Sequence, residues 1–506
     1  MRGLLLPCVG VVAAPQDGCH VVIVGAGIAG LATAQTLQRA NCTSVVLEAR
    51  STIGGRTETL QNGTFAGVEL GAHWVHGGLS NQVSAPLLAY LGIPITPIGG
   101  DDDFEGKRGN LAILDGQRVL LAKERKRGFH LFQEASNALE NYFDKHVPED
   151  CNGTATCRAT DQPESAAWAA ALKAIAPKLR DEDRKVLDLL KRMKWEQDYG
   201  DSMGAISGRV GELAGYTDFY PKHSKGDAFV NGGYRTLVDR LAENVTVHIG
   251  TPATDVVHSA SGVEVHTPTG VFKGTHVVLT APAAVLLAKV RVEPSFPQWK
   301  TEALQHIGRG IVGKALIKLT APLNASIPDM YSFVRADSAE TDLTQVCIWA
   351  GAEHAQRRDI LECFLGKSAV VATQDLSHEE LMARASKELA VAFGGAVRVG
   401  DIKLTQWQLE PYIGQAWSFP PLGAVAGDFD NYAKAVGRVH FAGEGACRLM
   451  WGNVHAALAT AGRAAHEIVT TMGRQDAVHS DWPLWQKKIR TLCEKSPKDL
   501  EDAVLV

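Results

Sequence analysis

The sequence lacks two features that would place it in broad classes of protein. No stretch of the 506 residues reaches the roughly 18 apolar residues that a membrane-spanning helix requires, so a multi-pass membrane protein is excluded. Basic residues are not in excess either, because 51 Lys and Arg stand against 56 Asp and Glu, a formal net charge of −5. Proteins that neutralise nucleic-acid phosphates carry a basic face, so nucleic acid is not an expected partner. Internal repeats and low-complexity tracts are also missing.

What the chain does contain is material for several buried cores. Hydrophobic residues make up 45% of it, and at about 150 residues per domain its length predicts about three units. Glycine is abundant, with 50 residues where an average share of about 7% would give fewer. The positions of these glycines are therefore informative.

The N-terminus has the order of a secretory signal. Residues 1–14 run from Met-Arg through a short apolar stretch to small residues where a peptidase can cut. Five N-x-[ST] sequons favour the same pathway: Asn41, Asn62, Asn152, Asn244 and Asn324. We expect a secreted or secretory-pathway glycoprotein; a cytoplasmic protein with a disordered leader is the alternative.

The cysteines fit an oxidising compartment. Nine become eight if Cys8 leaves with the leader, an even number compatible with disulfides. Cys19 opens one expected strand and Cys42 nearly opens the next, so parallel neighbouring strands would bring the two thiols together. Cys151 and Cys157 flank a polar loop and form a second candidate pair. The alternative is that each is reduced and buried as a small hydrophobic residue.

The periodicity predicts an interleaved α/β chain. Expected strands cover 20–24, 44–48, 244–279, 311–319, 346–350, 360–365 and 438–441. Expected helices cover 28–39, 128–144, 164–194, 378–393 and 454–472. Nucleotide-type elements lie at both ends of the chain and in its middle, which predicts two domains that exchange segments.

Glycines cluster at the first strand–helix junction. Gly25-Ala26-Gly27-Ile28-Ala29-Gly30 follows a β-branched run and opens a helical pattern. The first glycine allows the tight turn, the second lets the backbone approach a pyrophosphate, and the third lets the helix pack on the strand. The start of the helix offers unpaired N–H groups to phosphate oxygens. This element predicts a dinucleotide site; an ordinary turn is the alternative.

The second strand and the loop after it supply the groups that complete such a site. Glu48 lies 18 residues after Gly30, at the end of the strand, where a carboxylate can accept both ribose hydroxyls. Arg56 follows Gly54-Gly55 directly and suits a diphosphate that one helix end cannot fully neutralise. A surface arginine in a loop is the alternative for this residue.

Five sequence blocks then occur in the order of one family. LEARSTIGGRTET at 47–59, ELGAHWVHG at 69–77, NGGYRTL at 231–237, FAGE at 441–444 and GNVHAA at 452–457 resemble the motifs of the flavin amine oxidases. The second block is most similar to its polyamine-oxidase form. The resemblance covers about residues 20–470 and implies a Rossmann-type FAD-binding domain interleaved with an α+β substrate domain.

The resemblance implies that FAD is bound without a covalent bond, because the position of the flavin-linked cysteine of monoamine oxidases falls at Ala416. Glu48 would bind the ribose, Arg56 the diphosphate and Glu444 the ribityl chain or diphosphate. The expected cofactor-binding residues are Gly25, Ala26, Gly27, Ala29, Gly30, Glu48, Ala49, Arg50, Gly55, Arg56, His73, Trp74, Ala253, Glu444, Asn453 and Val454. No metal ion is expected.

Three residues are expected to carry the reaction. Lys314, in an alternating strand, resembles the family lysine that holds a water against the flavin; an edge-strand lysine is the alternative, which Lys318 fits better. Trp417 would supply an aromatic wall for an amine. His76 either tunes the protonation of the substrate amine or is hydrogen-bonded within a loop.

The chain departs from the family at the second aromatic wall, which maps to Asn453, with Trp451 two residues away. Asp198 and Asp201 are candidates for binding a remote ammonium group; a solvated loop is the alternative. An L-amino-acid oxidase would need an arginine for the substrate carboxylate, for which Arg309 and Arg448 are unsupported candidates. A catalytically inactive FAD-binding protein is a further alternative.

We therefore expect a FAD-dependent amine oxidase, with polyamines as leading substrates and O2 reduced to H2O2. Residues 15–80, 225–290 and 430–472 are assigned to the FAD-binding domain, 81–224 and 291–429 to the substrate domain, 1–14 to the leader and 473–506 to a tail. The expected partners are a small-molecule amine and O2.

Overall fold

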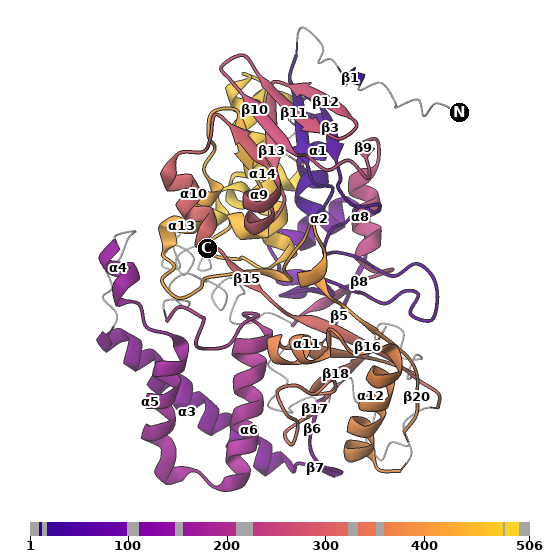
Figure 1. The fold of residues 1–506 in the computed structure, drawn as a ribbon, viewed down its shortest axis with the longest axis vertical. Helices are drawn as coiled ribbons and strands as arrows, with labels where there is room; N and C mark the ends of the chain where they lie inside the picture. Colours follow the sequence, from indigo (N-terminus) through magenta and orange to yellow (C-terminus); the bar gives the residue numbers. More distant parts are fainter. Residues whose placement is uncertain are drawn as a thin grey trace, which may run out of the picture.

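The computed structural model describes residues 10–12, 18–98, 111–146, 155–208, 226–321, 332–350, 359–395, 397–478 and 481–494. Segments that are distant in the sequence lie side by side in two regions of the molecule (Figure 1). One region contains a parallel sheet with its helices, and the other combines a larger sheet with a group of helices. The expected α/β fold class is confirmed.

The first region is built on a five-stranded sheet whose pairings are all parallel. Its strand order is β22 (Val439–Phe441), β13 (His276–Leu279), β2 (His20–Val24), β3 (Thr43–Leu47) and β9 (Thr246–His248). β13 is buried along its whole length, as expected for a parallel strand covered on both faces. Three distant chain segments thus form one sheet.

Two long helices pack together in this region. α1 (Ile28–Arg39) and α14 (Val454–Thr471) are rich in alanine, so their backbones can lie close. The tail reaches this pair, with Trp482 and Leu484 fully buried in the same core. Six shorter helices are α2 (Ser84–Tyr90), α8 (Tyr234–Ala242), α9 (Ala283–Lys289), α10 (Gln298–Gln305), α13 (Ala426–Ala433) and α15 (Lys487–Arg490).

A second sheet in this region has the order β1 (Gly10–Val12), β12 (Gly270–Gly274), β11 (Val263–Thr267), β10 (Asp255–His258) and β14 (Arg291–Glu293). β1 falls within the expected leader and pairs in parallel with β12. Smaller sheets join β4 (Trp74–Val75), β8 (Ala228–Val230) and β5 (Ile95–Pro97), and β15 (Gly308–Gly310) with β21 (Trp417–Phe419).

The second region contains a seven-stranded sheet. Its order is β20 (Val399–Leu404), β16 (Gly313–Leu319), β19 (Ile360–Leu365), β18 (Val346–Trp349), β17 (Ser332–Arg335), β6 (Leu111–Asp115) and β7 (Arg118–Val119). Two helices follow its strands, α11 (Lys367–Thr373) and α12 (His378–Phe393). β16 is paired on both sides, so the edge-strand interpretation of Lys314 and Lys318 is wrong.

The helical part of this region contains α3 (Ala122–His146), α4 (Ala155–Thr160), α5 (Glu164–Ile175) and α6 (Asp181–Lys191). The helical stretch expected over 164–194 is present but divided, because the chain breaks at Ala176-Pro177-Lys178. Proline removes a backbone donor and clashes with the preceding turn, which explains the break. A π-helix over Arg192–Gln197 continues from the end of α6.

Three disulfides lie in the described ranges. Cys19–Cys42 joins the starts of β2 and β3, which confirms the expected pair. Cys347–Cys363 crosses between β18 and β19, and Cys447–Cys493 ties the tail to the segment before α14. Cys151 lies outside the described residues. No described helix combines the length and apolar character needed to cross a membrane.

Acidification is expected to destabilise the fold through buried histidines. Burial, assisted by the neighbouring His440, lowers the pKa of His276 to about 4, and burial lowers that of His455 to about 3. In the unfolded chain these histidines have the ordinary pKa of about 6.5. As the pH falls from 7 to 5, they therefore bind protons in the unfolded state but remain neutral in the folded state, which favours unfolding. Each histidine then removes up to about 1.4 kcal/mol of stability per pH unit.

Calorimetric Tm values measured between pH 7.5 and 5 test this expectation. His276→Gln should flatten the pH dependence, whereas the same change at the exposed His130 should leave it unchanged. Equal slopes in the wild type and His276→Gln would contradict the assignment.

Candidate active site

One cavity of about 1170 Å³ joins the two regions. It is larger than the roughly 300–1,000 Å³ of a typical ligand pocket, so a dinucleotide and a substrate fit in it together. The predicted residues on its wall are Gly25, Gly27, Ala29, Glu48, Ala49, Arg50, Gly55, Arg56, His73, Trp74, His76, Ala253, Lys314, Trp417, Glu444, Asn453 and Val454. Ala26 and Gly30 lie next to it without forming its wall.

The glycine turn forms one end of the cavity. Gly25 has a positive φ of 107°, which glycine adopts without strain, and its N–H donates to the Leu47 carbonyl. α1 begins after Gly27 with no side-chain cap, so its first N–H groups are available to an anion. Glu48 stabilises this turn by accepting from the N–H groups of Ala26 at 2.7 Å and Arg50 at 2.8 Å.

Glu48 is a buried carboxylate in this part of the cavity. Burial raises its pKa above the usual range, against the opposing effect of the backbone N–H groups and Arg50. A carboxylate oxygen accepts more than one hydrogen bond, so both oxygens retain capacity for ribose hydroxyls. The position expected from the sequence therefore has the chemistry that the ribose requires.

Arg56 and Glu444 form an ion pair on the cavity wall. Arg56 Nη1 donates to Glu444 Oε1 at 2.8 Å and to the Ala416 carbonyl at 3.0 Å. Glu444 also accepts from the Gly452 N–H at 2.7 Å and the Ser418 hydroxyl at 2.9 Å. The two residues were expected to contact the cofactor separately; the structure also links them to each other, which joins the N-terminal loop to the C-terminal segment.

Lys314 reaches the cavity from the internal strand β16. It is 6% exposed and donates to the Glu69 carbonyl at 3.1 Å. Its ammonium group also forms an ion pair with Glu362 of β19. An ammonium has three N–H groups, so beyond these two acceptors one donor remains for a molecule in the cavity.

Glu362 was not predicted from the sequence. It is fully buried, and its Oε1 is also 3.0 Å from Nδ1 of His73. Burial alone would raise the pKa of this carboxyl, but the charges of His73 and Lys314 outweigh it and lower the pKa to about 2. A lone glutamate within the apolar strand Ile360–Leu365 was the available signal, because a buried charge requires a partner.

His76 lies on the cavity wall and its ring is hydrogen-bonded, as its loop interpretation expects, so it also has access to a molecule in the cavity. Its Nδ1 is 3.1 Å from Oδ2 of Asp227, which also lines the cavity. Asp227 accepts in addition from the Gly77 N–H at 2.8 Å. Asp227 was missed because it lies 151 positions away in the sequence. An imidazole whose Nδ1–H is held by a carboxylate can accept a proton at Nε2.

Two tryptophans form aromatic parts of the wall. Trp417 packs against Gly452, where an added Cβ would lie 3.4 Å from the indole. Trp451 lies 5.6 Å from the Tyr199 ring and also lines the cavity. Asn453 donates its amide to the carbonyls of Met450 and Trp451, and so stabilises the loop that carries Trp451. At the position where the family resemblance places a second aromatic side chain, Asn453 thus makes hydrogen bonds within the loop.

The remaining candidates divide clearly. Asp198 lines the cavity and is exposed to solvent, whereas Asp201 is buried in an ion pair with Lys367 at 2.8 Å and does not line the cavity. The expectation that Asp201 binds a remote ammonium is therefore wrong, as is its alternative of a solvated loop. Neither Arg309 nor Arg448 forms part of the cavity wall in the described residues.

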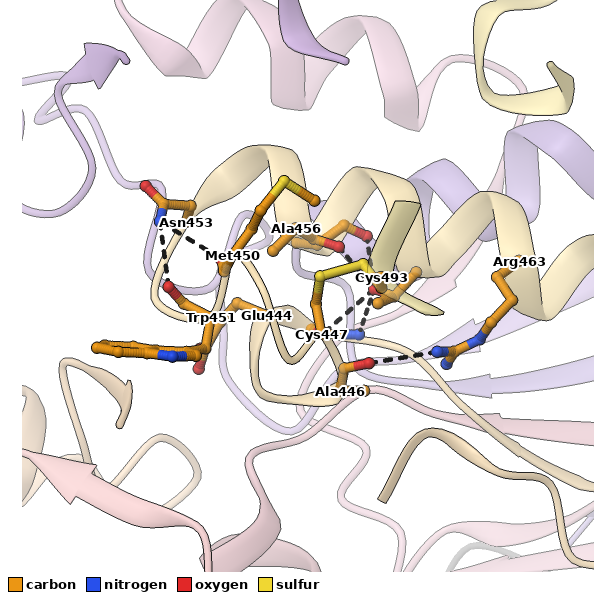
Figure 2. Close-up of a disulfide and its surroundings, with 12 residues drawn as sticks. Glu444, Ala446, Cys447, Met450, Trp451, Asn453, Ala456, Arg463 and Cys493 are labelled. Carbon is orange, nitrogen blue, oxygen red and sulfur yellow. Dashed lines mark hydrogen bonds between the residues drawn. A yellow bond between two sulfur atoms is a disulfide. The ribbon is translucent and has the colours of Figure 1, made fainter. Parts of the chain in front are cut away.

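The Cys447–Cys493 disulfide supports the segment from Glu444 to Asn453. Figure 2 shows this bond beside α14, with Trp451 and Asn453 farther along the same loop. Arg463 of α14 donates to the Ala446 carbonyl at 3.2 Å and holds the start of the loop. Both ends of this loop lie on the cavity, so the tail stabilises part of the site from behind.

Removing this disulfide is expected to weaken both the fold and cofactor binding. In the double variant Cys447→Ser/Cys493→Ser, the disulfide no longer closes a 46-residue loop. The unfolded chain then gains conformational entropy, which lowers the free energy of unfolding by about 4 kcal/mol. The matched variant Cys19→Ser/Cys42→Ser opens a 23-residue loop at the starts of β2 and β3, and the same entropy change there lowers the free energy of unfolding by about 3 kcal/mol. Both should lower Tm, but the first should weaken FAD binding more in a titration of apoprotein. Equal FAD affinities would contradict a supporting role.

The family model described as flavin containing amine oxidoreductase matches residues 28–469. The chain belongs to this family. Polyamine oxidase 5 of Oryza sativa subsp. japonica is 23% identical, covering 90% of this chain and 89% of the relative. Polyamine oxidase 3 of the same plant is 25% identical and covers 88% of each chain. Lysine-specific histone demethylase 1 homolog 3 of Arabidopsis thaliana is 24% identical, but the match spans 30% of its length.

The structural comparison supports the same fold. A putrescine oxidase solved with putrescine superposes with a TM-score of 0.70 at 20% identity, covering 89% of this chain and 99% of the other. The chain is a FAD-dependent amine oxidase. Its residues fit the cofactor, because an uncapped helix N-terminus, a buried ribose-type carboxylate and an arginine line one continuous cavity.

Proposed function

We propose that this flavin amine oxidase acts on polyamines and that dioxygen is its electron acceptor, reduced to hydrogen peroxide. The observation that supports this best is the composition of the cavity wall. Besides Glu48 and Glu444, which are expected to hold the cofactor, two carboxylates, Asp198 and Asp227, line it together with apolar and aromatic side chains. Such a wall suits a flexible chain with ammonium groups, since carboxylates bind the charges and apolar surface covers the methylenes. The relatives named polyamine oxidases support the same substrate class.

The side chains divide the work between binding and proton control. Bound FAD would supply the hydride acceptor for oxidation of the carbon beside the amine nitrogen. His76, oriented by Asp227, accepts the proton of the reacting ammonium and leaves a neutral amine. Trp417 and Trp451 orient this amine and exclude water, and Lys314 offers a fixed N–H donor to the cavity. Asp198 retains the ammonium group that does not react.

Anaerobic mixing of the FAD-loaded protein with spermine, spermidine or putrescine tests the substrate class. The yellow colour should bleach, and aerobic turnover should release peroxide in a peroxidase-coupled assay. Asp198→Asn should raise KM for the polyamines while changing KM for benzylamine little, because benzylamine has no second ammonium. Bleaching by L-amino acids alone would overturn the proposal, and no bleaching by any amine would favour an inactive FAD-binding protein.

We further propose that the protein follows the secretory pathway. The three disulfides fit an oxidising compartment, and the sequon residues Asn41, Asn62 and Asn244 are exposed. Expression in a secreting eukaryotic cell should give medium-borne protein whose mass falls on enzymatic deglycosylation. Retention in the cytosol without glycans would overturn this localisation.

A further inference from the structure

The register of two strands brings Glu362 to Lys314. In the antiparallel pair β16–β19, Lys314 lies opposite Phe364 and Leu316 lies opposite Glu362. Residues two apart share a face of a strand, so Glu362 is the diagonal neighbour of Lys314. Because β16 and β19 are both internal strands, this arrangement is rigid.

One carboxylate oxygen links two residues of the cavity wall. Glu362 Oε1 accepts from Lys314 Nζ and lies 3.0 Å from His73 Nδ1. His73 is stacked on Phe229 at 4.4 Å, which fixes its ring plane. The titratable groups that face Lys314 in the described chain are Glu362 from β19, and Glu69 and His73 from the loop before β4. Glu362 does not itself line the main cavity.

Burying a carboxylate destabilises the folded state unless the charge is paired and hydrogen-bonded. Apolar residues of similar volume at both positions would pack at least as stably as a buried ion pair. The stability of the fold therefore gives no reason for a charge at this position. The cavity gives one, since Lys314 must point a charged donor into it.

We infer that Glu362 is a positioning residue of the oxidase: it fixes the Lys314 ammonium at the cavity, balances its charge, and holds the His73 ring behind it. The ammonium is then a fixed hydrogen-bond donor at the cavity. This inference depends on the amine oxidase activity and is independent of which amine is oxidised.

Two substitutions separate positioning from stability. Glu362→Gln keeps the shape but removes the charge, so Lys314 loses its counter-ion. Glu362→Asp keeps the charge but shortens the reach. Glu388→Gln is the matched control, because Glu388 is a buried carboxylate of α12 that is paired with Arg384 and does not line the cavity.

The readouts are the pH profile of kcat, KM for the best amine, and the absorption spectrum of bound FAD across pH. Glu362→Gln should lower kcat by about 10²-fold, as a misplaced catalytic group does, with KM nearly unchanged. The spectrum of bound FAD across pH should differ from that of the wild type, because the lysine at the cavity has lost its counter-ion. Glu362→Asp should shift both in the same direction by less, and Glu388→Gln should shift neither.

The inference is overturned if Glu362→Gln lowers Tm alone and leaves the flavin titration and the pH profile as in the wild type. If Glu362→Gln does not fold, Glu362→Asp decides by the same two readouts. The spectral titration needs no substrate, so it gives a result even if polyamines are not oxidised.

Discussion

Lys314→Met is expected to reduce kcat of the FAD-loaded enzyme by about 10²–10³-fold while FAD stays bound. The methionine fills a similar volume but removes a buried donor from the cavity, and a single preorganised donor contributes a factor of this size. Lys314 does not contact the glycine turn or Glu48, so FAD affinity should change little. Stopped-flow absorbance with the best amine, followed by reoxidation with O2, measures the effect.

Lost stability is the competing explanation, and a second substitution removes it. Lys314→Met leaves Glu362 buried with His73 alone, and breaking a buried pair costs about 3–5 kcal/mol. The double variant Lys314→Met/Glu362→Gln no longer buries that charge, so its Tm should recover while kcat stays low. Lys318→Met is the control on the same strand, where the lysine is 29% exposed and paired with Asp359. Wild-type kcat in Lys314→Met would remove the lysine from the mechanism.

The cofactor end of the site was predictable because its signals are local. Gly25–Gly30, Glu48 and Arg56 lie within one strand–helix–strand unit, and each residue type there has few alternative uses. The Cys19–Cys42 bond followed from the same unit, since both cysteines begin neighbouring strands. Local order along the chain was sufficient for these features.

The substrate end was less predictable because its contacts are non-local. Glu362 and Asp227 reach Lys314 and His76 through strand register and loop packing that no short motif encodes. The pairing of Cys447 with Cys493 could not be deduced either, because several cysteines leave many connectivities open. The break in the helical stretch expected over 164–194 was missed for a different reason: the periodicity of the sequence continues through Pro177, although a regular helix cannot.

The glycine turn gives the second prediction, in which two similar substitutions fail in different ways. Gly27 has a φ of −74°, and an added Cβ there would lie 4.0 Å from its nearest neighbour, the Gly54 carbonyl oxygen. Gly27→Ala should therefore leave the Tm of the apoprotein unchanged. Its methyl group would occupy the space through which a pyrophosphate approaches, and an overlap of about 1–3 kcal/mol weakens FAD binding about 10- to 100-fold.

Gly30→Ala should act on the fold itself. A Cβ at Gly30 would lie 1.9 Å from the Gly25 carbonyl oxygen, so α1 and the turn must move apart before any cofactor binds. Apoprotein Tm should fall in this variant, with FAD affinity falling as a consequence. Thermal unfolding of the apoproteins and fluorescence titration with FAD distinguish the two mechanisms. The protein itself has room for the added methyl group at Gly27, so only a bound phosphate would clash with it. Wild-type FAD affinity in Gly27→Ala would therefore show that the phosphates do not approach this turn.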